Sequence, residues 1–219
     1  MKFQERRKVM QYPGTVMLLE KLALSAGTSH KEIRALARER IEAALQVALI
    51  ELGGLPQAAQ KNWRLERNAQ GAPIFPAGYV GSIAHCQSHA ALIVAPQGRQ
   101  NDDQTNYGLR SVGIDVEDIS RFSNLSIKNR ILSMEELQEQ DLSLKDLALI
   151  FCAKEALYKM LAPLVKSWFG LRDVSLAKTA DGFRAKTLVD LSTEFKAGSE
   201  FSVQAYYDNN LVIAWSKLP

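Results

Sequence analysis

Two carboxylates lie two residues apart in the segment SVGIDVE, residues 111–117. Apolar residues alternate there with a glycine and the two acids, a period of two that predicts a β-strand with one buried face. On such a strand Asp115 and Glu117 share the other face, roughly 7 Å apart, and like charges this close repel each other. Hard oxygen ligands grouped in this way suit Mg²⁺. The spacing alone fits either a metal site or an acidic strand face in water.

A third carboxylate and a lysine come from the segment FCAKEALYK, residues 151–159. Glu155 and Lys159 are four residues apart and therefore share one face of a helix, where an ion pair in water is the default interpretation. The surrounding residues make much of this helix apolar, which indicates that both side chains lie at the edge of a core. Together with Asp115 and Glu117 they form a plausible site for Mg²⁺ and phosphate.

Other polar residues precede these segments. In GSIAHC, His85 follows an apolar stretch at a turn, and together with the strand residue Ser82 it could bind phosphate, although most turn histidines are simply hydrogen-bonded. The arginines at 34, 38 and 40 lie on one predicted helix as either a solvated face or phosphate ligands.

Two long helices are predicted. The first covers residues 29–54, with Ser29 and Glu32 as a capping box and two glycines at the end. The second covers residues 143–162, with Ser143 and Asp146 as start signals and a proline after it. A further helix-like stretch spans residues 124–140.

The remaining segments read as strands and turns. Residues 62–86 predict a strand, a turn at 68–71 and another strand, and residues 89–95 predict a strand antiparallel to 81–84. A polar loop follows at 96–110, and four strands are predicted in the tail, with a hairpin turn at 207–211. We therefore expect an α+β fold of two similar subdomains, 1–105 and 106–219.

The composition of the 219 residues, 47% hydrophobic and 23% charged with a net charge of +3, is that of a globular protein with a sizeable core. Two distant cysteines and three histidines argue against a disulfide framework, a zinc site or a histidine-rich metal centre. We see no apolar signal segment and no run long enough to cross a membrane, so we expect a cytoplasmic protein. A basic stripe interleaved with aromatic residues is also absent, so we expect no nucleic-acid partner.

The motifs GID-x-E and (W/F)-x-x-K-E-x-x-x-K, preceded by NAQGAPIF and GSIAHC, resemble the 4′-phosphopantetheinyl transferases. The chain is similar to their longer type, which serves siderophore, peptide and polyketide synthases. The resemblance implies a monomer with a pseudo-twofold pair of α+β halves and coenzyme A in the cleft between them. It also implies Mg²⁺-dependent transfer of phosphopantetheine from coenzyme A to a serine of an apo acyl or peptidyl carrier protein, which presents an acidic helix. Adenosine 3′,5′-bisphosphate is the implied second product.

In the second half, the resemblance implies that Asp115, Glu117 and Glu155 bind Mg²⁺ and that Lys159 contacts the pyrophosphate. The carrier serine needs a base to take its proton, and Glu155 is the candidate for that role. Glu155 could also be a metal ligand, and the sequence leaves both roles open.

In the first half, the resemblance implies that Arg40 contacts the phosphates of coenzyme A and that the turn from Arg67 to Ala72, with Gly71, holds the nucleotide. Ser82 and His85 match the segment near the adenosine phosphate and the pyrophosphate. The chain departs from the family pattern at four positions: Glu39 for Gly, Ala72 for Lys or Arg, Ala84 for Ser, and Phe151 for Trp.

Two alternative functions fit the same residues. D-x-E with a nearby Glu–Lys pair also occurs in Mg²⁺-dependent nucleases. A non-catalytic module could instead use the arginine-rich helix to hold an acidic partner.

Overall fold

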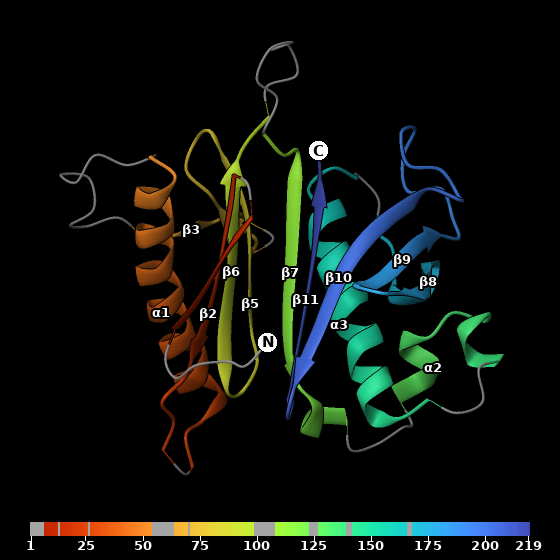
Figure 1. Ribbon diagram of the computed structural model, residues 1–219, viewed down its shortest axis with the longest axis horizontal. Coiled ribbons are helices and arrows are strands. Elements are labelled where there is room, and N and C mark those ends of the chain that lie inside the picture. Colours follow the sequence, from red (N-terminus) through yellow and green to blue (C-terminus); the bar gives the residue numbers. More distant parts are fainter. Residues whose placement is uncertain are drawn as a thin grey trace. The chain divides into compact units, whose positions relative to one another are not determined.

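The computed structural model describes residues 7–12, 14–25, 27–53, 64–69, 71–98, 108–122, 127–138, 142–165 and 168–219. The chain divides into two compact units, Met1–Val112 with Leu218–Pro219 and Gly113–Lys217. The predicted boundary between residues 105 and 106 lies outside the described residues. Each unit combines one long helix with one main sheet (Figure 1).

The first unit has a four-stranded sheet in the order β1-β2-β6-β5, with every neighbouring pair antiparallel. Its elements are β1 Arg7–Tyr12, β2 Thr15–Lys21, α1 His30–Glu51, β3 Glu66–Arg67, β4 Pro73–Ile74, β5 Tyr79–His85 and β6 His89–Pro96. The predicted hairpin of residues 81–84 with 89–95 is confirmed, and it pairs His85 with Ala90 next to the turn.

Helix α1 begins where the sequence predicted. The Ser29 side chain accepts from the backbone N–H of Glu32, and the Glu32 carboxylate accepts from the backbone N–H of Ser29. Helix α1 lies beside the sheet (Figure 1). Its apolar stripe packs against alternate residues of β2 and β6, which form the core of this unit. The main members of this core are Ile33, Ala37, Ile41, Leu45, Leu18, Leu92 and Val94.

The turn between β3 and β4 is built as the sequence predicted. The backbone N–H of Gly71 donates to Asn68 O at 2.9 Å, and Gly71 has φ +82°, a conformation that favours glycine. After β4, the Phe75 ring lies against Gly81, where an added Cβ would come within 2.2 Å of it. The absence of a side chain at Gly81 therefore lets the ring pack beside β5.

The second unit has a five-stranded sheet in the order β7-β11-β10-β9-β8. Its strands are β7 Ser111–Asp118, β8 Val174–Thr179, β9 Gly182–Thr187, β10 Glu200–Asp208 and β11 Leu211–Leu218. Strands β8 to β11 pair as antiparallel neighbours, and Asn209 adopts φ 50° in the turn between the last two. The four predicted tail strands and their hairpin turn are confirmed.

The helices of the second unit are α2 Lys128–Ile131, α3 Leu144–Leu161 and the 3₁₀ turns η2 Ile119–Phe122, η4 Glu136–Gln138 and η5 Leu171–Asp173. The predicted continuous helix over 124–140 is wrong where the chain is described. Leu132 is extended after α2, and Ser133 and Glu136 form reciprocal hydrogen bonds that start a new turn. Residues 124–126, 139 and 140 lie outside the described part.

Helix α3 begins at the predicted capping box of Ser143 and Asp146, and it ends at Leu161, before Pro163. The predicted α+β class is confirmed, with few helices and antiparallel strand pairs. Among the described residues, no helix combines the length and apolarity that crossing a membrane requires. The cytoplasmic location, the pseudo-twofold relation and the monomeric state stay predictions.

Candidate functional site

Strand β7 directs its two acids toward α3. A Cβ added at Gly113 would lie 1.9 Å from Ala156 O, so this face of the strand lies directly against the helix. Because side chains alternate along a strand, Asp115 and Glu117 share that face with Gly113. Both acids are buried, with 5% exposure each. The interpretation of an acidic strand face in water is therefore wrong: this strand is buried on both faces.

Lys159 pairs with Asp115. Its Nζ lies 2.7 Å from Asp115 Oδ1 and 3.2 Å from the backbone oxygen of Ile114. The ion pair between Glu155 and Lys159 that their spacing suggested does not form among the described residues. The other oxygen of Asp115, Oδ2, is buried and has no hydrogen-bond partner in the described part of the chain. A buried carboxylate oxygen without a partner is costly, so this atom marks a place where a cation or donor would be stabilised.

Arg121 pairs with Glu117, a partner that the sequence did not indicate. Its Nη1 donates to Glu117 Oε1, and its guanidinium carbon lies 5.2 Å from the centre of the Phe151 ring. In the sequence, Arg121 comes four residues after Glu117. That spacing indicates a side-chain pair only if the strand is followed by a helical turn. The 3₁₀ turn η2 directly after β7 supplies that turn.

Burial and mutual repulsion dominate the electrostatics of this cluster. Burial raises the pKa of Glu117 to about 7, with a further rise from the charge of Asp115 and an opposing effect of Arg121. Burial and then the charge of Asp115 also raise the pKa of Glu155. Burial lowers the pKa of Lys159, but the neighbouring acids, Asp115 first, outweigh it and the net shift is upward. The three carboxylates of the cluster thus offer more negative charge than its two cations, Lys159 and Arg121, neutralise.

The three carboxylates are close enough to influence one another, but they are not drawn into a tight group. Among the described residues, no choice of one oxygen each from Asp115, Glu117 and Glu155 brings all three atoms within 4.8 Å of one another. Two of these acids are instead tied to separate cations, Lys159 and Arg121. Glu155 is half-buried on α3 and makes no side-chain hydrogen bond to another described residue.

Lys154, next to Glu155, has a structural role. Its Nζ lies 2.5 Å from Glu136 Oε2, 3.0 Å from Ile131 O and 2.8 Å from Val174 O, and its side chain is 1% exposed. Burial lowers the pKa of Lys154, and the Glu136 carboxylate opposes that shift. These bonds anchor the middle of α3, and hence Glu155, to three other segments of the unit.

The candidates of the first unit are spread over three elements. Arg40 is exposed on α1, and Arg67 on β3 donates through Nη1 to Gly71 O at 2.6 Å, which ties it to the predicted turn. Ser82 is buried, whereas His85 is exposed at the end of β5. Because they are three positions apart on a strand, their side chains point to opposite faces. Their joint role in binding phosphate stays a prediction.

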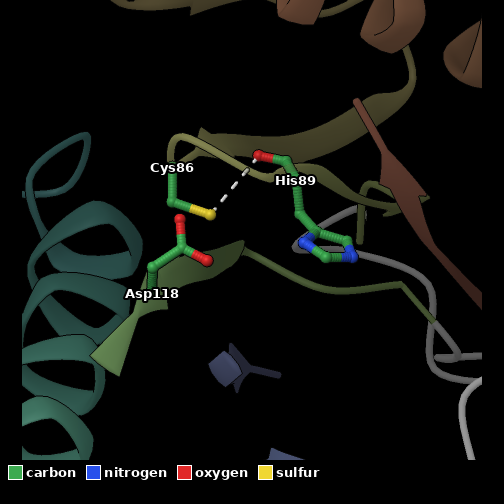
Figure 2. A group of neighbouring side chains, drawn as sticks. All are labelled: Cys86, His89 and Asp118. Atoms are coloured by element: carbon green, nitrogen blue, oxygen red, sulfur yellow. Dashed lines mark hydrogen bonds between the residues drawn. The ribbon is translucent and has the colours of Figure 1, made fainter. Parts of the chain in front are cut away.

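The turn that follows His85 is held by its own side chains. Cys86 Sγ donates to His89 O at 3.7 Å (Figure 2). Ser88 Oγ lies 2.7 Å from His89 Nδ1. Asp118, also labelled in Figure 2, is the last residue of β7 and belongs to the second unit.

Two family models match the chain. Residues 34–95 match the 4′-phosphopantetheinyl transferase N-terminal domain, and residues 111–216 match the 4′-phosphopantetheinyl transferase superfamily. The chain therefore belongs to the 4′-phosphopantetheinyl transferase superfamily, in its longer form with an N-terminal domain. The predicted family is confirmed.

Two curated relatives are similar to the chain. The 4′-phosphopantetheinyl transferase Npt of Nocardia iowensis is 36% identical over 60% of this chain and 53% of its own length. The 4′-phosphopantetheinyl transferase PptT of Mycobacterium tuberculosis is 31% identical over 68% of this chain and 63% of its own length. The chain thus spans between half and two thirds of each relative.

A solved structure is also similar, the holo-[acyl-carrier-protein] synthase (AcpS) of Neisseria meningitidis. The identity is 20% and the TM-score 0.37, over 51% of this chain and 98% of that one. The family assignment rests on the two family models and the curated relatives.

Proposed function

We propose that this protein transfers the 4′-phosphopantetheine group of coenzyme A to a serine of an apo acyl or peptidyl carrier protein. The observation that carries the proposal is the match of both family models to a chain whose second unit buries Asp115 and Glu117 against the helix of Glu155 and Lys159. The serine oxygen attacks the β-phosphorus of coenzyme A, the bond from that phosphorus to the bridging oxygen breaks, and adenosine 3′,5′-bisphosphate leaves. The proton of the serine hydroxyl goes to a base of the protein.

The donor set fits a hard divalent cation, and we propose Mg²⁺. Asp115, Glu117 and Glu155 offer carboxylate oxygens, and Asp115 Oδ2 is buried without a hydrogen-bond partner among the described residues. When bound, Mg²⁺ would offset the negative charge on the pyrophosphate as the phosphorus–oxygen bond breaks.

Glu155 is the proposed base. Its side chain makes no hydrogen bond to another described residue, and burial raises its pKa, which suits a carboxylate that must accept a proton near neutral pH. Glu155 could act as a metal ligand as well, and both roles require it to be ionised before reaction. The anchoring of Lys154 beside it limits how far Glu155 can move.

Lys159 is proposed to stabilise phosphate charge. It keeps a positive charge at neutral pH because the neighbouring acids raise its pKa, and its side chain is 28% exposed. A positioned ammonium group of this kind favours an anionic transition state. For coenzyme A binding by the first unit we propose Arg40, Arg67, Gly71, Ser82 and His85.

The test is carrier loading. The protein is incubated with coenzyme A, Mg²⁺ and several apo carrier proteins, and mass spectrometry follows the carriers. We expect a mass increase equal to one phosphopantetheine group, located on a serine and abolished by EDTA. Absence of any loading over a broad set of carriers would contradict the proposal.

The same preparation separates the two alternatives. Mg²⁺-dependent cleavage of DNA with unlabelled carriers would identify a nuclease. Steeply salt-dependent binding to nucleic acid, without any Mg²⁺-dependent reaction, would identify a binding module.

A further inference from the structure

Arg121 lies at the border between solvent and the buried acids. Its side chain is 60% exposed, whereas that of its partner Glu117 is 7% exposed. The guanidinium also lies over the ring of Phe151, 5.2 Å from its centre. Phe151 is itself held by Phe122, with ring centres 5.4 Å apart, so the aromatic surface beside Arg121 is fixed.

The two cations of the cluster are held very differently. Lys159 is more enclosed, with 28% of its side chain exposed, and it donates to both Asp115 Oδ1 and Ile114 O. Arg121 reaches the cluster from outside through one carboxylate oxygen. A guanidinium that leaves Glu117 loses little, because water and the Phe151 ring both stabilise it.

Glu117 cannot give up its partner so easily. Removing one member of an ion pair leaves the buried charge of the other uncompensated, which is strongly destabilising. Asp115 adds to this cost, since its charge also acts on Glu117. When it is ionised, Glu117 therefore needs a cation, and Arg121 is placed to supply one when no metal ion is bound.

We propose that Arg121 is an exchangeable counter-ion of Glu117. The Arg121 guanidinium pairs with the Glu117 carboxylate in the metal-free protein and leaves it when a divalent cation binds there. Arg121 is thus a positioning residue that acts through Glu117. The inference rests on the proposed metal role of Asp115, Glu117 and Glu155. It implies that Arg121 stabilises the metal-free protein and, by competition, weakens metal binding.

The test measures Mn²⁺ binding to the full chain without coenzyme A, by the loss of the free Mn²⁺ signal in electron paramagnetic resonance. We expect Arg121→Ala to lower the dissociation constant roughly tenfold, because one competing and repelling charge is removed. Arg121→Lys, which keeps the charge, should stay near the wild-type value. Arg121→Gln, which keeps a donor but no charge, should resemble Arg121→Ala and serves if the alanine variant does not fold.

A matched control exists in the first unit. Arg38 pairs with Glu42 at the same spacing, with side-chain exposures of 54% and 7%, and Arg64 also contacts Glu42, at 3.3 Å. Arg38→Ala should leave the Mn²⁺ dissociation constant unchanged. In a Glu117→Gln background, Arg121→Ala should improve binding less than in the wild type, because the competition for Glu117 is gone.

Thermal unfolding gives a second readout. In EDTA, Arg121→Ala should unfold at a lower temperature than the wild type, and Mn²⁺ should raise its unfolding temperature by more. Unchanged or weaker Mn²⁺ binding by Arg121→Ala, with the wild type binding normally, would overturn this inference alone. A wild-type protein that binds no Mn²⁺ but loads carriers would overturn it together with the metal role, and leave the proposed transfer standing.

Discussion

At the scale of residues, the candidate site contains two buried carboxylates, and in each of them one oxygen is paired with a cation. Lys159 occupies one oxygen of Asp115, and Arg121 occupies one oxygen of Glu117. Asp115 Oδ2 is left buried without a hydrogen-bond partner among the described residues. This explains why two acids are tolerated on a buried strand. Lys159 and Arg121 neutralise part of their charge, and the negative charge that is left favours binding of a divalent cation.

The proposed reaction makes a direct prediction for Glu155. Glu155→Gln keeps the size of the side chain but cannot take a proton, so we expect carrier loading to fall by about 10²–10⁴-fold, the usual contribution of a positioned base. Asp115→Ala should also abolish loading. Circular dichroism should show an unchanged fold for Glu155→Gln. Loading near the wild-type rate in either variant would refute the proposed mechanism.

The pKa of Glu117 predicts how metal affinity depends on pH. Below its folded-state value of about 7 the carboxyl is largely protonated, and a cation must displace that proton. Affinity for Mn²⁺ should therefore fall as pH drops from 8 to 6, and by less in Glu117→Gln. Dissociation constants measured across this range check the prediction, and a flat profile in the wild type would contradict it.

Lys159 is expected to act on the coenzyme. Lys159→Ala should weaken binding of coenzyme A in the presence of Mg²⁺, because an ammonium near the phosphates is lost. Calorimetry measures the effect, with Lys178→Ala as a control lysine that pairs with Asp146 at the surface. Equal affinities of Lys159→Ala and the wild type would remove Lys159 from the phosphate site.

At the scale of elements, close packing fixes the distance between helix α3 and strand β7. Gly113 leaves no room for a Cβ between strand and helix, since that atom would lie 1.9 Å from Ala156 O. The buried pair of Lys154 and Glu136 anchors the same helix to other segments. Two packing features therefore set where Glu155 and Lys159 lie relative to Asp115.

The anchoring pair gives a stability prediction. Lys154→Met leaves Glu136 as a buried acid without its cation, so we expect a loss of about 3–5 kcal/mol in the free energy of unfolding. The double variant Lys154→Met/Glu136→Gln should lose less, because no unpaired charge remains. Lys178→Met, which breaks a partly exposed pair between β8 and Asp146 of α3, should change stability by no more than about 1 kcal/mol. Denaturant unfolding measures all three, and an equal loss in the single and double variants would contradict this account.

At the scale of the whole molecule, the proposed functions are divided between the two units. All three proposed metal ligands lie in the unit Gly113–Lys217, while Arg40 and His85 lie in the other. Arg40→Ala and His85→Ala should therefore raise the concentration of coenzyme A needed for half-maximal loading. They should leave Mn²⁺ affinity of the coenzyme-free protein unchanged. A change in Mn²⁺ affinity in either variant would show that this division is wrong.

Several features of this protein follow from the sequence alone, because they depend on neighbours a few residues apart. The capping boxes at Ser29 and Ser143, the β5–β6 hairpin and the tail strands are of this kind. The family could also be recognised from the sequence, because its motifs are short and follow one another along the chain in the family's order. The helix predicted over 124–140 failed because Ser133 and Glu136 start a new turn there.

The tertiary structure decided which groups become partners. Lys159 had Glu155 as its neighbour along the helix, yet it pairs with Asp115, 44 residues earlier in the chain. Lys154 likewise pairs with Glu136, which belongs to a different turn. The burial of both faces of β7 was equally hidden, since alternation shows which residues share a face but not what covers it. Packing α3 against Gly113 turned an acidic strand face into a buried site, because burial removes the water that would otherwise solvate the two acids.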